Sequence, residues 1–103
     1  MPLKPADFYI LLALAGHPLH GYGIMKEVER ESHGDVRLEI GSLYRILARL
    51  LAEGLLEDAE SDSRRRRYRL SRQGRRLLKA EAERLAGLVT LVRARKLLPE
   101  AEA

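Results

Sequence analysis

The stretch LEIGSLYRILARLLAEGLL, residues 38–56, decides how the rest of the chain is interpreted. Gly41-Ser42 is a suitable helix start, because a serine in the first turn can accept a hydrogen bond from a backbone N–H. Gly54 is a suitable end, because glycine tolerates the left-handed conformation that follows many helices. The stretch predicts one amphipathic helix, whose buried stripe consists of Leu43, Ile46, Leu47, Leu50 and Leu51.

Two more helices are expected before this stretch. Residues 6–15 are apolar nearly all round, which is typical of a helix that is buried on more than one side. Gly16-His17-Pro18 signals a turn, and a second helix then runs from about residue 21 to residue 32. A short extended piece is expected at residues 36–38.

A hairpin and a long helix are expected after it. Residues 55–60 and 66–70 have the pattern of antiparallel strands, joined by the polar tip at residues 61–65. Ser71 can cap a last helix over residues 72–98, whose apolar side chains repeat at close to the coiled-coil spacing. The predicted fold is therefore mainly α: a winged helix-turn-helix, with three helices and a two-stranded β wing, followed by a long C-terminal helix.

The first and last helices carry more apolar side chains than one small domain can bury. We therefore expect two parts, a winged-helix domain at residues 1–71 and a C-terminal dimerisation helix with a frayed tail at residues 72–103. A dimer core alone would explain the surplus, and a pocket for a small hydrophobic effector is the further alternative. The residues expected in that interface or pocket are Phe8, Leu12, Leu78, Leu85, Leu88, Val89 and Val92.

Composition excludes several classes of function. The chain has 103 residues and no cysteine, so disulfides, thiolate chemistry and cysteine-based zinc sites are ruled out. No carboxylate cluster completes a metal site with the three histidines, and no nucleophile pair or glycine-rich phosphate loop is present. We expect no enzyme, metal or cofactor. The apolar run at residues 8–15 is too short to span a membrane, and a cytoplasmic location is expected.

The net charge of +4 favours a polyanionic partner, but its distribution carries the argument. Residues 64–76 hold eight arginines and no acid. Arginines on a wing can contact the phosphates of DNA, which gives affinity without sequence readout. The alternatives are a solvated basic surface, or salt bridges to Glu57, Asp58 and Glu60 across the hairpin. The wing residues predicted to contact DNA are Arg64, Arg65, Arg66 and Arg67.

The polar side of the central helix completes the predicted DNA-binding surface. Arg45 could reach a guanine edge or a phosphate, whereas Tyr44 could instead pack on the second helix and Arg49 could face solvent. The start of the second helix is another place for a phosphate, although a tight turn alone would explain Gly21. The residues predicted here are Gly41, Ser42, Tyr44, Arg45, Arg49, Gly21, Tyr22 and Lys26.

The sequence resembles the PadR family of bacterial transcriptional regulators. The residues that carry the resemblance are Pro18-Leu19-His20-Gly21-Tyr22, Gly41-Ser42-Leu43-Tyr44, Leu50 with Glu53-Gly54-Leu55, and Tyr68-Arg69-Leu70-Ser71 with Gly74-Arg75. The resemblance implies a dimeric winged-helix repressor whose last helix forms the dimer, with a ligand pocket in some members. The chain departs from the family pattern at Gly23, where many relatives have glutamate, at Ile40, where many have proline, and in lacking a glycine at the wing tip.

These observations predict a homodimeric, sequence-specific DNA-binding transcriptional regulator that acts as a repressor. In the predicted arrangement the central helix enters the major groove of a two-fold related operator and the wing holds the backbone. The alternative is a winged helix that binds an acidic protein partner.

Overall fold

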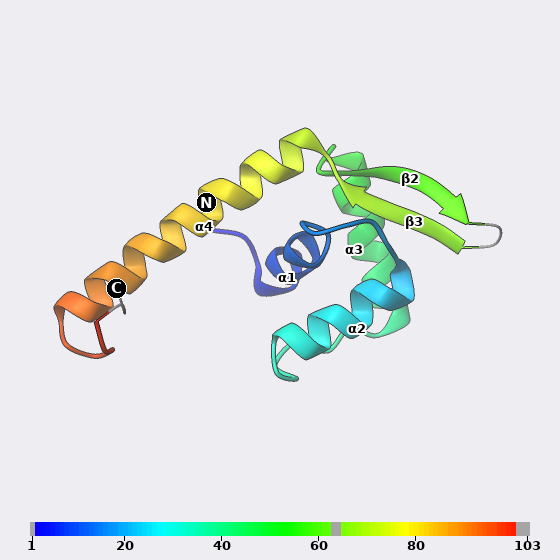
Figure 1. Cartoon of the computed structure of the whole chain (residues 1–103). Coiled ribbons are helices and arrows are strands. Elements are labelled where there is room, and N and C mark those ends of the chain that lie inside the picture. Colours follow the sequence, from blue (N-terminus) through cyan, green and yellow to red (C-terminus); the bar gives the residue numbers. More distant parts are fainter. Residues whose placement is uncertain (1, 63–64, 101–103) are drawn as a thin grey trace.

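The computed structural model describes residues 2–62 and 65–100. Its helices and strands follow the predicted order and confirm the predicted fold class (Figure 1). They are α1 (Pro5–Ala13), β1 (Leu19–His20), α2 (Gly21–Glu31), α3 (Ile40–Ala52), β2 (Leu56–Asp62), β3 (Arg65–Leu70) and α4 (Arg72–Ala94).

The sheet has one strand more than the sequence predicts. The strand β3 lies between β1 and β2 and is antiparallel to both, with Leu19 opposite Tyr68 on one side and Asp58 opposite Tyr68 on the other. The two residues of β1 are too few to show the alternation that reveals a strand. Residues 36–38, where a short extended piece is expected, form no strand, and the Val36 N–H donates to the Ser32 hydroxyl at 2.9 Å.

The core lies where α1, α2 and α3 meet the sheet. Tyr68 and Leu70 alternate with the half-buried Arg67 and the exposed Arg69 along β3, so one face of this strand joins the core. The fully buried side chains include Ile10, Leu11, Leu14, Ile24, Val28, Leu43, Leu47 and Leu50. The predicted leucine stripe of α3 therefore forms the centre of the molecule.

The two ends of α3 differ in how well they match the prediction. The helix begins at Ile40 with Glu39 as its N-cap, so Ser42 lies inside the first turn and does not cap it. Gly54 ends the helix as predicted, with a φ of 76°. The N–H groups of Gly54 and Leu55 donate to the carbonyls of Leu51 and Leu50, which are the two bonds of a Schellman motif.

A compact joint connects the end of α3 to the start of α4. The Ser71 hydroxyl accepts the Gly74 N–H at 2.9 Å, which confirms the predicted cap, and it donates to the Gly54 carbonyl at 2.7 Å. The Ser71 N–H donates to the Leu55 carbonyl at 3.1 Å. A Cβ at Gly74 would lie only 2.1 Å from that carbonyl oxygen, so the close approach requires glycine.

The molecule is elongated, with principal extents of 51, 27 and 26 Å. Helix α4 projects from one side of the body and the β2–β3 hairpin from the other (Figure 1). The first turns of α4 pack on the body through Leu78, and the N-terminal segment is held there by a 3.1 Å bond from the Leu3 N–H to Glu81. None of the described helices is both long enough and apolar enough to cross a membrane. The predicted domain boundary at residue 71 stays a prediction.

Candidate nucleic-acid interface

A cleft of about 490 Å³ gathers predicted DNA-binding residues from three separate segments. The start of α2 supplies His20, Gly21 and Tyr22, α3 supplies Tyr44, and β3 supplies Arg65 and Arg66. Two tyrosine hydroxyls, two guanidinium groups and the N-terminus of a helix suit an anionic ligand. The fold therefore places a helix end, a neighbouring helix and the wing around one opening.

Tyr44 packs against the start of α2 and also faces solvent. A Cβ at Gly21 would lie 2.5 Å from the Tyr44 hydroxyl, so the absence of a side chain at Gly21 makes room for the phenol. Tyr44 nevertheless keeps 47% of its surface exposed. Beside it, the ammonium group of Lys26 lies 5.5 Å from the centre of the Tyr22 ring. Tyr44 thus combines packing on α2 with a partly exposed side chain, which the sequence left as alternatives.

Arg66 borders the cleft but is engaged with an acid. Its Nε and Nη2 donate to the two carboxylate oxygens of Asp58 at 2.6 and 3.1 Å. These bonds hold the pKa of the Asp58 carboxyl below its ordinary value. The guanidinium carbon also lies 5.1 Å from the centre of the Tyr68 ring, and burial raises the pKa of that phenol. Tyr68 is therefore neutral at physiological pH.

The other wing arginines differ in their contacts. Arg67 is half-buried and donates to the carbonyls of Pro18 and Glu60, both at 3.4 Å. Arg65 is exposed and has no acidic partner among the residues that the structure describes. Arg64 lies outside the described residues. Salt bridges across the hairpin, the alternative for the arginine cluster, exist at Asp58 and also at Glu57, which contacts Arg69 at 2.9 Å.

The polar residues of α3 separate into two groups. Gly41 and Arg45 are exposed near the start of the helix and Ser42 is half-buried there, and Arg45 has no acidic partner within residues 2–62 and 65–100. Arg49 lies elsewhere, because its Nη2 contacts both carboxylate oxygens of Asp7 in α1, at 2.8 and 2.9 Å. Its Nη1 contacts Glu53 at 3.1 Å. The structure therefore does not bring Arg49 to the cleft.

Asp7 is not among the residues predicted from the sequence. It is buried, and its carboxylate accepts from Arg49, 42 positions later in the chain. The signal was a single acid in a helix that is otherwise apolar, since an ionised side chain is rarely buried without a partner. The side chain that pairs with it could not be identified from the sequence, because the chain has eight arginines between residues 64 and 76 and two more in α3.

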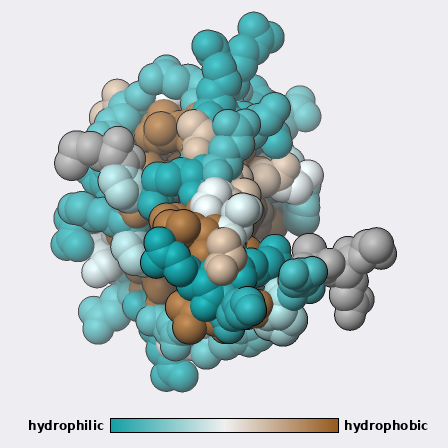
Figure 2. All heavy atoms as spheres, turned by 90° about the vertical axis from the view of Figure 1, so that its left-hand side faces the viewer, coloured by the Kyte–Doolittle hydropathy of each residue, from teal (hydrophilic) through white to brown (hydrophobic). Residues whose placement is uncertain are grey.

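A second surface, on α1 and α4, is apolar. Leu12, Leu88 and Leu91 are 40%, 46% and 50% exposed, and Val89 is also exposed. Viewed from the side on which α4 projects, apolar side chains appear between hydrophilic ones (Figure 2). Phe8, Leu85 and Val92 are half-buried in the same helices, whereas Leu78 belongs to the core of the single chain. Large apolar side chains left exposed in this number are typical of interaction surfaces.

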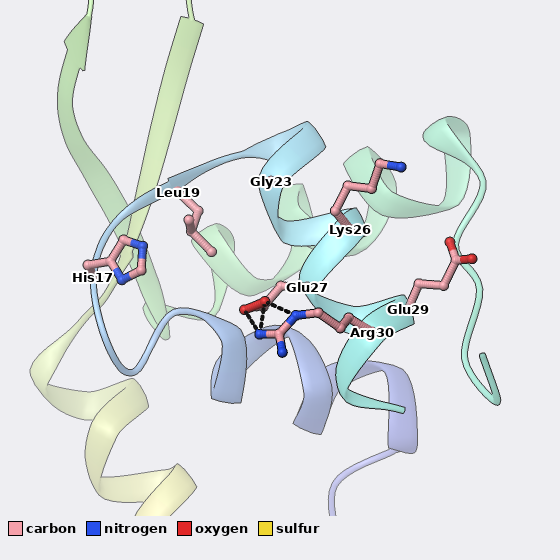
Figure 3. Close-up of a pocket in the computed structure, with 7 residues that line it drawn as sticks. All are labelled: His17, Leu19, Gly23, Lys26, Glu27, Glu29 and Arg30. Atoms are coloured by element: carbon pink, nitrogen blue, oxygen red, sulfur yellow. Dashed lines mark hydrogen bonds and ion pairs between the residues drawn. The ribbon is translucent and has the colours of Figure 1, made fainter. Parts of the chain in front are cut away.

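Another pocket lies beside α2 (Figure 3). It shares no residue with those predicted to line the dimer interface or effector pocket. Arg30 points across it to Glu27, and its Nε and Nη2 donate to the carboxylate at 2.9 and 2.8 Å. Lys26 and Glu29 extend in other directions (Figure 3). Because its arginine is already paired and its other polar groups diverge, this pocket offers no convergent set of ligand-binding groups. Within the described residues, no three His, Asp or Glu side chains gather as metal ligands.

Three helices, a short antiparallel sheet with a β2–β3 wing, and a cleft between α2, α3 and that wing define a winged helix-turn-helix protein. Residues 10–80, more than half of the chain, match the transcriptional regulator PadR-like family. The chain belongs to this family, as the resemblance implied.

Solved structures share the fold. A PadR family transcription regulator from Clostridium difficile superposes with a TM-score of 0.73 at 20% identity, over 88% of this chain and 97% of that one. The PadR protein of Bacillus subtilis, solved in complex with operator DNA, superposes with a TM-score of 0.66 at 21% identity, over 75% of this chain and 46% of that one.

A relative in sequence is an uncharacterized 37.1 kDa protein in transposon TN4556 of Streptomyces fradiae. It is 43% identical over 88 residues, which cover 85% of this chain and 25% of that protein. The chain thus spans about a quarter of the length of this relative.

Proposed function

We propose that the protein is a dimeric, sequence-specific DNA-binding transcriptional regulator that acts as a repressor. The observation that carries the proposal is the cleft in which Tyr22, Tyr44 and Arg65 converge beside α3. Family membership supports it, and so does the PadR protein of Bacillus subtilis with its operator DNA. In a cytoplasmic regulator of this kind, α3 enters the major groove and the wing lies on the phosphate backbone.

The proposed roles follow from exposure and charge. The guanidinium of Arg45, which is exposed and has no acidic partner in the described part of the chain, reads a base edge, preferably guanine. The backbone N–H groups at Gly41 and Ser42, and those at Gly21 and Tyr22, receive phosphates at the starts of their helices. Tyr44, Lys26, Arg64, Arg65, Arg66 and Arg67 add backbone contacts. Arg49 is a positioning residue in this proposal, because its bonds to Asp7 tie α3 to α1.

A second copy of the chain is proposed to cover the apolar surface of α1 and α4. The exposed Leu12, Leu88 and Val89, with the half-buried Phe8 and Leu85, support this assignment. An isologous contact of this kind would relate two copies of α3 by a two-fold axis, which matches a palindromic operator. A small hydrophobic effector would bind within the same interface.

Salt dependence and selective variants test the DNA-binding proposal. Duplexes selected from a random pool should share a palindromic consensus, and their affinity should fall steeply as salt rises, because phosphate contacts release counterions. Arg65→Gln should weaken the binding of all duplexes to the same extent. It should also reduce the slope of log affinity against log salt concentration by roughly two for a dimer. Arg45→Gln should reduce the binding free energy for the consensus duplex by about 1–3 kcal/mol. It should also relax the base preference at one position in each half-site.

Arg95→Gln is the matched control, because Arg95 is exposed at the far end of α4. It should bind like the wild type. Duplex binding that is insensitive to salt would contradict the proposal. The alternative, a module that binds an acidic protein, predicts instead that the chain captures such a partner, that it binds no duplex, and that Arg45→Gln leaves the protein contact unchanged.

Gly21→Ala should weaken DNA binding more than it weakens the fold. The new Cβ would meet the Tyr44 hydroxyl at 2.5 Å, and the phenol at the end of a flexible side chain can move away at little cost. Moving it disturbs the cleft, so we expect roughly tenfold weaker duplex binding with a stability loss under about 1 kcal/mol. Gly23→Ala is the control, since its Cβ would make an ordinary 3.6 Å contact with Leu19. Equal affinities for the two variants would refute the role of Tyr44.

A further inference from the structure

The described part of the wing carries two arginine–acid pairs on opposite faces of the hairpin. Arg66 contacts Asp58 with two hydrogen bonds, and Arg69 contacts Glu57 at 2.9 Å. Successive side chains of a strand point to opposite faces, so Arg66 shares its face with the buried Tyr68, and Arg69 lies on the other. Only Arg66 of these two arginines lines the cleft.

The geometry of the first pair matters for an incoming phosphate. Asp58 occupies the edge of the guanidinium formed by Nε and Nη2, which is one of the two edges that bind an oxyanion through parallel hydrogen bonds. A phosphate that enters the cleft therefore meets a nearly neutral pair instead of a cation. The side chains of Arg66 and Asp58 are 55% and 59% exposed, so solvent screens the pair and a phosphate can displace the carboxylate.

We propose that Asp58 attenuates DNA binding by competing with a backbone phosphate for Arg66. The inference rests on the proposed function and adds a residue that sets its strength. Eight arginines between residues 64 and 76 would give strong binding to any duplex. A carboxylate on the cleft side of the wing reduces that sequence-independent binding, and so lowers the fraction of protein held at non-operator sites.

The test compares Asp58→Asn with Glu57→Gln in the full chain. Both variants remove one negative charge from the same strand, but only the first releases an arginine that lines the cleft. With labelled operator and unrelated duplexes at low salt, Asp58→Asn should bind both about fivefold more tightly than the wild type. Glu57→Gln should bind like the wild type. The gain should shrink as salt rises, because salt screens the exposed pair.

A double-mutant cycle separates competition for Arg66 from simple repulsion between Asp58 and DNA. In an Arg66→Gln background, Asp58→Asn should give no gain, whereas repulsion alone would preserve it. A preserved gain would overturn the proposal, as would unchanged or weaker binding by Asp58→Asn, or an equal gain with Glu57→Gln. If the wild type binds no duplex at any salt concentration, the proposed function itself fails. Melting temperatures of all variants verify that each is folded.

Discussion

Gly74→Ala is expected to destabilise the protein by at least about 3 kcal/mol, which is a large part of the stability of a small domain. The new Cβ would lie 2.1 Å from the Leu55 carbonyl oxygen, and both partners belong to the main chain. No side-chain rotation can relieve that contact. The start of α4 must instead move, which breaks the bond from the Ser71 N–H to the same carbonyl. Urea unfolding at fixed protein concentration measures the loss.

Gly41→Ala is the matched control for this prediction. A Cβ at Gly41 would meet no atom within 4 Å, and the residue lies in the first turn of α3. Without DNA, this variant should equal or slightly exceed the wild type in stability, because alanine favours a helix over glycine. If Gly74→Ala and Gly41→Ala unfolded at the same urea concentration, this would contradict the close contact between Gly74 and the Leu55 carbonyl.

Leu88→Glu is expected to separate the proposed dimer and to abolish tight operator binding. Leu88 is 46% exposed on α4, and a two-fold interface would contain it twice. Burying two unpaired carboxylates is costly, so the dissociation constant of the dimer should rise by roughly a hundredfold or more. Sedimentation at micromolar concentration should then show a monomer. Operator affinity should fall by a comparable factor, because one copy of α3 reads only one half-site.

Leu97→Glu is the control for the dimer prediction. Leu97 is 73% exposed and follows the end of α4, outside the predicted apolar set. This variant adds the same charge to the same end of the chain and should sediment like the wild type. A Leu88→Glu protein that stayed dimeric would show that the second copy binds another surface.

The α3 helix could be predicted from the sequence because two local signals agree. Its leucines repeat at helical spacing, and Gly54 supplies the left-handed residue that a Schellman motif needs. The cap at Ser71 could likewise be predicted, and Gly74 belongs to the motif that carries the family resemblance. Their shared contact with Leu55 was not visible, because it joins backbone groups that only the folded chain brings together. The strand β1 was missed because it depends on pairing with β3 and has almost no pattern of its own.

The residues of the candidate site could be predicted from their types and positions in the sequence. Which of its arginines are paired with acids could not. Arg65, Arg66 and Tyr44 were expected to face DNA, and the cleft brings them together. The sequence could not distinguish Arg66, paired with an acid, from Arg65, which has none among the described residues, because strand register decides which side chains meet. Arg49 was likewise indistinguishable from Arg45, since only the packing of α1 on α3 reveals Asp7.

Helix α4 extends away from the joint between α3 and α4, so a small change of angle at this joint becomes a large displacement at the far end of the helix. The joint consists of Gly54, Leu55, Ser71 and Gly74. The 23 residues of α4 reach roughly 34 Å from it at 1.5 Å per residue. A tilt of about 5° at the joint would displace the far end by about 3 Å, which is close to the 3.4 Å rise of one base pair. In the proposed dimer, the backbone bonds at this turn, together with the packing of Leu78 and the bond from Leu3 to Glu81, would therefore limit how much variation in half-site spacing the regulator tolerates.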